Sequence, residues 1–122
     1  MTARSLARLQ AAGRLVAGAG LTFAPGVVAA SWVGKTADTR DGQLLAIGLG
    51  ARDVAIAAGT LHALRSRRGA RAWLRAGVAA DAADLAATLR ARDAIPPLAL
   101  PAVVAIAGGS VLLGAYLQSA LD

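Results

Sequence analysis

Four long apolar segments, separated by short polar stretches, make up almost the whole chain. They span residues 4–24, 43–64, 72–90 and 97–121. Each is close to the ~20 residues that an α-helix needs to cross the hydrocarbon core of a bilayer. The last segment carries no charge from Ala94 to Leu121, whereas a surface helix of a water-soluble protein would have a polar face. The pattern therefore predicts an all-α fold, an integral membrane four-helix bundle forming a single transmembrane domain over residues 1–122.

The end of the first segment has two interpretations. In one, Pro25-Gly26 stops the helix near Ala24, which places Arg14 near its middle. In the other, the helix starts after Arg14 and continues to Gly34, so that Arg14 extends to the membrane surface. We prefer the first interpretation, in which residues 27–32 form a short segment at the membrane interface.

Charged side chains lie inside the second and third apolar segments. At the centre of a membrane each charged residue costs ~2.5–3.5 kcal/mol of insertion free energy. The charged residues of either segment together cost more than its aliphatic residues contribute in favour of insertion. Arg52 lies thirteen residues before Arg65, and Asp84 lies thirteen residues after Arg71, at the two ends of the connecting loop. Arg52 and Asp84 therefore lie at about the same depth. Opposite charges at one depth can satisfy each other. We therefore predict a polar network in the membrane, made of Arg14, Arg52, Asp53, Asp81 and Asp84.

The predicted network has two roles that the sequence leaves open. It can act as an internal ion-pair network that fixes the helix register, or as an ion path or proton relay. Two Arg and three Asp leave one net negative charge. That excess predicts a retained proton, a bound cation or one Asp that faces water.

A second cluster of charge surrounds the connection between the second and third segments. It consists of Arg65, Arg67, Arg68, Arg71, Trp73 and Arg75. With only 3% aromatic residues there is no stacking surface for nucleic acid, so the net charge of +6 indicates topology and contact with anionic lipid headgroups. Six basic residues flank the side of the termini and four flank the other side, which predicts that both termini are cytoplasmic.

Few residues could carry catalysis or bind a metal. The chain has no cysteine, and its only histidine, His62, cannot form a His-rich metal site. Asp81 and Asp84 have a spacing that could hold Mg²⁺ beside a substrate phosphate, but the further residues of such a site are missing. The sequence therefore assigns no catalytic residue, metal or cofactor, and it does not favour an enzyme.

Several short motifs resemble a group of small four-helix membrane proteins from high-GC bacteria. They are Gly13-Arg14, Phe23-Ala24-Pro25, Gly50-Ala51-Arg52-Asp53, Arg71-x-Trp73 and Ala80-Asp81-x-x-Asp84. In size and helix count this group is similar to DoxX-like proteins. The resemblance implies that the first helix ends at Pro25, which adds Arg14 to the polar network, and it implies no particular activity.

Small residues on the helix faces predict close packing between helices. In the first segment a small-residue stripe is formed by Gly13, Ala17, Gly20 and Ala24. We therefore predict a non-enzymatic component of the cell membrane (inner or plasma membrane), a homo-oligomer or the subunit of a complex with a partner membrane protein. The alternative is a small proton- or cation-linked transporter that uses the intramembrane Arg/Asp network. Lipid is an expected partner and nucleic acid is not.

Overall fold

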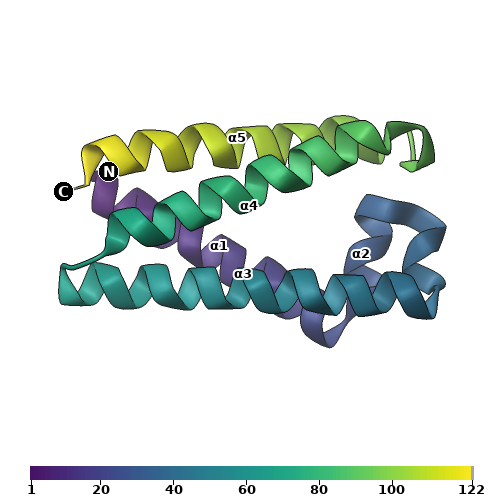
Figure 1. Ribbon diagram of the computed structural model, residues 1–122, viewed down its shortest axis with the longest axis horizontal. Helices are drawn as coiled ribbons and strands as arrows, with labels where there is room; N and C mark the ends of the chain where they lie inside the picture. Colours follow the sequence, from purple (N-terminus) through teal and green to yellow (C-terminus); the bar gives the residue numbers. More distant parts are fainter. Residues whose placement is uncertain (122) are drawn as a thin grey trace.

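The computed structural model describes residues 1–121, and within them it contains only helices and the turns that join them (Figure 1). The five α-helices are α1 (Ala3–Phe23), α2 (Pro25–Val33), α3 (Arg40–Ser66), α4 (Ala70–Arg90) and α5 (Ala99–Ala120). Two short 3₁₀ helices are η1 (Gly34–Asp38) and η2 (Arg92–Ala94). The all-α prediction is confirmed. Four long helices overlap the four predicted segments, but the predicted count of four is not confirmed, because α2 is a separate fifth helix.

Local chemistry explains where α1 begins and ends. The Thr2 hydroxyl accepts a hydrogen bond from the Ser5 amide at 3.1 Å, which caps the first turn. At the other end Pro25 has no N–H to continue the helix, but it suits the first turn of α2. The α2–η1 segment is bent by 111° relative to α1. The structure therefore agrees with the interpretation in which the first helix stops before Pro25.

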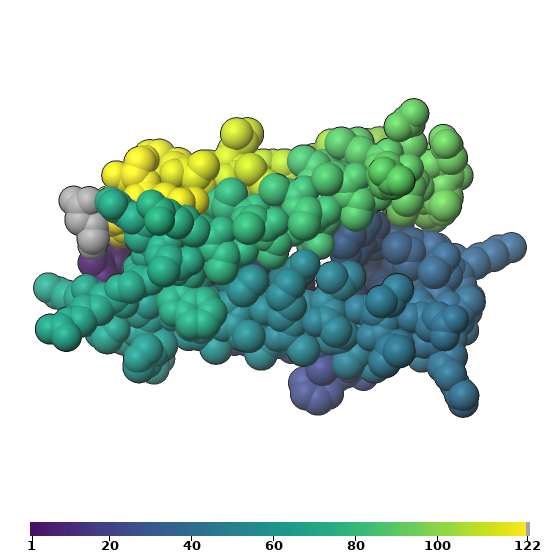
Figure 2. All heavy atoms as spheres, in the orientation of Figure 1, coloured from purple at the N-terminus to yellow at the C-terminus, as the bar shows by residue number. Residues whose placement is uncertain are grey.

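A tight turn makes α3 and α4 antiparallel. The backbone at Arg67 and Gly69 has φ values of 58° and 75°, in the left-handed region that ends a helix and reverses the chain. The Arg4 guanidinium donates to the Leu64 carbonyl at 3.0 Å, so α1 helps to satisfy the end of α3. This turn, the N-terminus and the end of α5 all lie at one end of the molecule (Figure 1, Figure 2).

The helices pack in antiparallel pairs, α1 with α3 and α4 with α5. At the centre of the first pair Gly18 faces Gly50. A Cβ atom added to Gly50 would lie 2.5 Å from the Gly18 carbonyl oxygen, so only glycine permits this approach. The expected stripe of small residues does not make this contact, because Gly13 has open space beside it and Gly20 faces Val28 of α2.

Two apolar clusters lie toward opposite ends of the bundle. One joins α1, α3, α4 and the end of α5 through Ala7, Leu64, Leu74, Leu117 and Leu121. The other joins α1, α2, η1 and α3 through Leu21, Ala29, Ala37 and Ala46. Arg14 of α1, and Arg52 and Asp53 of α3, lie between these clusters along their helices. The core is therefore apolar at both ends and polar in the middle.

Much of the apolar surface faces outward. On α5 only Gly114 and Leu117 are buried, while Ile106 and Leu112 are 71% and 74% exposed. By length and composition α3 and α5 could each cross a membrane, and α1 with α2–η1 would be a third span if this bent pair is one unit. The helix α4, which carries Asp81 and Asp84, is not among these candidates. These apolar helices suggest a multi-pass membrane protein.

Candidate functional site

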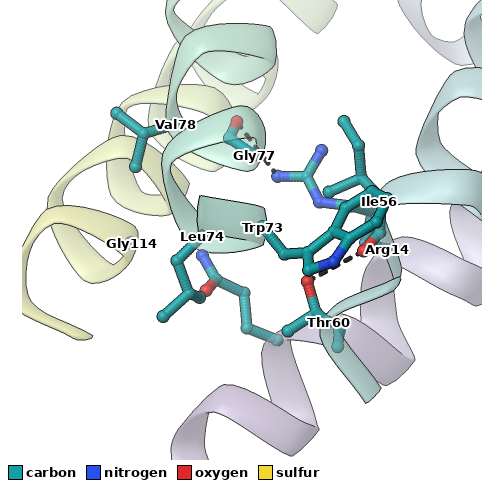
Figure 3. Close-up of a pocket in the computed structure, with 10 residues that line it drawn as sticks. Arg14, Ile56, Thr60, Trp73, Leu74, Gly77, Val78 and Gly114 are labelled. Carbon is teal, nitrogen blue, oxygen red and sulfur yellow. Dashed lines mark hydrogen bonds between the residues drawn. The ribbon is translucent and has the colours of Figure 1, made fainter. Parts of the chain in front are cut away.

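Arg14 connects three helices through its guanidinium group. It projects from the middle of α1, donates to Asp53 of α3 at 3.1 Å and forms an ion pair with Asp81 of α4. The same group lies 3.5 Å from the Gly77 carbonyl oxygen, and Figure 3 shows its side chain reaching toward that carbonyl. Only 10% of the side chain is exposed. Arg14 is therefore at the centre of the site rather than at the surface.

Arg52 joins α3 to α4 through a bidentate ion pair. Its Nη1 and Nη2 atoms donate to the two carboxylate oxygens of Asp84 at 3.0 and 2.7 Å. Two parallel N–H···O bonds of this kind fix both the distance and the orientation of the partners. Arg52 also donates to Oδ1 of its neighbour Asp53, at 3.3 Å from Nε and 3.1 Å from Nη2.

One oxygen atom connects the two arginines. Asp53 Oδ1 accepts from Arg14 and from Arg52, both at 3.1 Å to the nearest nitrogen. The ion pairs therefore form one continuous network across α1, α3 and α4. The structure brings together all five residues of the predicted polar network, and their joint charge is −1.

Glycine makes this geometry possible. Asp53 has a short side chain, so Arg14 reaches it only if α1 and α3 lie close together. Gly18 is one turn beyond Arg14, and a Cβ there would lie 2.8 Å from the Gly50 carbonyl oxygen and 3.0 Å from Asp53 Cβ. A larger residue at either position would push the helices apart and lengthen the ion pair.

A cleft of about 580 Å³ opens beside the network. Its walls come from α1, α2 and α5, and Arg14, Asp53, Asp81 and Asp84 lie along it. The apolar part of the lining is formed by Gly13, Ala17, Leu21, Val28, Val103, Ile106, Ala107 and Leu113. On the side of Arg14 that faces Trp73 and Thr60 there is only a small pocket of about 10 Å³, roughly the room for one water (Figure 3).

The predicted headgroup cluster lies at the end of the molecule where α3 turns into α4. Its arginines, Arg65, Arg67, Arg68, Arg71 and Arg75, are exposed, as is His62. Trp73 is exposed as well, but its indole also covers Gly59 of α3, where an added Cβ would lie only 2.3 Å from the ring. Trp73 therefore packs α4 onto α3, and its side chain remains 39% exposed.

Two further polar contacts were not predicted from the sequence. The Trp32 indole N–H of α2 donates to the Thr88 hydroxyl of α4 at 3.1 Å. The Gln10 amide of α1 donates to the Ser110 carbonyl of α5 at 3.1 Å. Helical spacing offers a signal for both, because Gln10 precedes Arg14 by four residues and Thr88 follows Asp84 by four.

Within residues 1–121 no three His, Cys, Asp or Glu side chains are placed to hold a metal ion together. No protein-family model, curated protein or solved structure matches this chain. The comparisons therefore identify no family, and the likeness to DoxX-like proteins stays a prediction.

Proposed function

We propose that the chain is a non-enzymatic, multi-pass membrane component with four spans and cytoplasmic termini. The observation that carries this proposal is the exposure of α5. None of its 22 residues is charged, and only two of them are buried. Monomeric soluble proteins rarely expose continuous apolar surface of this extent. At 1.5 Å per residue the helix is ~33 Å long, enough for the ~30 Å hydrocarbon core.

The direction of the helices supports the proposed topology. The N-terminus, the turn at Arg67–Gly69 and the end of α5 lie at one end, and α2 and η2 lie at the other (Figure 1). The arginines of the α3–α4 connection are therefore at the end that the positive-inside rule assigns to the cytoplasm. In this placement α4 crosses with its two carboxylates directed at the arginines of α1 and α3.

The ionic network has a structural role in this proposal. Arg14 and Arg52 each contact residues on a neighbouring helix, so the network selects one register of α1, α3 and α4. Fixing a register is the best-attested use of buried polar groups. The outer faces of α3 and α5 leave room for a partner protein to pack against them. A Cβ added to Gly48, Gly108 or Gly109 would meet nothing within 4 Å.

Membrane placement is tested by fractionation and topology reporters. The tagged chain should stay in the membrane pellet after alkaline carbonate extraction. Reporter fusions at both termini and within the turn at Arg67–Gly69 should be active on the cytoplasmic side, and fusions at Thr36 or Asp93 on the opposite side. Release by carbonate would refute the membrane placement, and a reporter at Asp93 on the cytoplasmic side would refute four spans.

The cleft favours a second candidate, a proton- or cation-linked carrier. Three aspartates line it, and the network carries one more negative than positive charge. The discriminating measurement is proton-coupled uptake in liposomes containing the Asp84→Asn variant. A variant that folds normally but has lost uptake would favour the carrier over the structural component.

A further inference from the structure

The cleft combines a size and a lining that are typical of a small-molecule site. Its volume of about 580 Å³ is within the usual range for such sites, ~300–1,000 Å³. Most of its lining surface is apolar and includes aliphatic side chains of α1, α2 and α5, whereas Gln10, Ser31 and Ser110 add polar groups. The charged residues that line it belong to one ion-paired network. A ligand that fits this cleft would therefore have an apolar body and one localised charge.

The charge of the occupant follows from the network. Among residues 1–121 no side chain donates a hydrogen bond to Asp53 Oδ2 or Asp81 Oδ1, whereas both oxygens of Asp84 are held by Arg52. No fully buried side-chain oxygen in that range lacks a partner, so these two oxygens are not sealed off by protein. Both belong to residues that line the cleft. One excess negative charge and two available carboxylate oxygens are complementary to a single positive charge.

The cleft is open at its sides. Gly13 and Ala17 of α1, Ser31 of α2 and Ile106 of α5 line it and are themselves exposed. In the membrane placement proposed above, on which this step rests, the opening between α1 and α5 faces lipid. A ligand that partitions into the bilayer could then enter sideways.

We propose that this cleft binds a lipophilic monovalent organic cation, with its charge beside Asp53 and Asp81 and its apolar body against α1 and α5. A lipid acyl chain would occupy the space between the apolar walls but leave the excess negative charge uncompensated. A small metal ion would pair with the carboxylates but would leave the apolar walls unoccupied. A monovalent organic cation satisfies both the charge and the apolar walls.

Two probes of the same shape and opposite charge test the proposal. Tetraphenylphosphonium and tetraphenylborate are compared by equilibrium dialysis against the purified full chain in uncharged detergent, with protein-free micelles subtracted. We expect saturable binding of the cation, ~10-fold or more tighter than that of the anion, since one uncompensated charge at contact distance is worth at least this factor. Equal binding of both probes, or binding of neither, would overturn the proposal.

Matched variants then locate the site. Ala107→Phe places a ring in the cleft without changing any charge, and Ala105→Phe makes the same change on an exposed position of the same helix that does not line the cleft. Cation binding should fall ~10-fold or more in A107F and stay within about twofold of the native chain in A105F. Asp81→Asn, checked for folding by gel filtration, should also lose cation preference. Cation binding that survives in A107F would place it elsewhere and refute the inference, whatever fractionation shows about the membrane.

Discussion

The contact between Arg52 and Asp84 allows a double-mutant cycle whose result is set by the charge of the network. Arg52→Gln changes the joint charge from −1 to −2, Asp84→Asn changes it to 0, and the double variant returns it to −1. Breaking a buried ion pair from one side typically costs ~3–5 kcal/mol. Arg52 is 30% exposed, so solvent screening reduces this to ~1–3 kcal/mol for each single variant.

Arg52→Gln should be the more harmful single change, because it leaves Arg14 as the one positive charge in a network with three carboxylates. The double variant should be more stable than the sum of the single effects by ~1–2 kcal/mol, the size expected for residues in one network. The free energy of unfolding is measured in mixed micelles by titration with sodium dodecyl sulfate, using helical circular dichroism. Arg40→Gln with Asp41→Asn is the control, an exposed pair of neighbours outside the network. Additive effects within about 0.3 kcal/mol would refute the argument that these residues act as one unit.

Two more predictions concern contacts that bring the helices together. Gly50→Ala should lower the free energy of unfolding by ~1–3 kcal/mol because its Cβ would lie 2.5 Å from the Gly18 carbonyl oxygen, whereas Gly48→Ala should raise it by ~0.5–1 kcal/mol. The same detergent titration checks both, and equal effects would contradict the close approach. Trp32→Phe should cost ~1 kcal/mol through the lost bond to Thr88, and the same change in a Thr88→Val background should cost less. An unchanged cost in that background, measured by thermal unfolding, would show that the hydrogen bond does not stabilise the fold.

The residues of the polar centre could be predicted because charge in an apolar segment has few acceptable environments. Counting from a shared turn gives the depth of Arg52 and Asp84 without knowledge of the packing, since both helices rise by the same amount per residue. The Pro25-Gly26 pair favours the interpretation in which the first helix stops there, although the alternative that ends near Gly34 stays open until the structure is known. These predictions depend only on residue type and on distances along the chain.

Contacts that depend on helix rotation could not be predicted in the same way. Small residues occur on nearly every side of α1, so the stripe at Gly13 and Ala17 and the contact at Gly18 are equally acceptable by size. The reach of Arg14 to Asp53 decides between them, and it is a property of two packed helices. The cleft could not be predicted for a similar reason, because it needs the relative positions of α1, α2 and α5.

The order in which the ribosome makes these helices gives the Arg14 contacts a consequence for biogenesis. Arg14 emerges 39 residues before Asp53 and 67 residues before Asp81. At ~5–20 residues per second, its partners follow after roughly 2–13 s. In the membrane placement proposed above, α1 has an unpaired charge during that interval and enters the bilayer stably only after α3 and α4 exist. Nascent chains arrested before Asp53 should therefore be extractable by carbonate, and chains arrested after α4 has emerged should not.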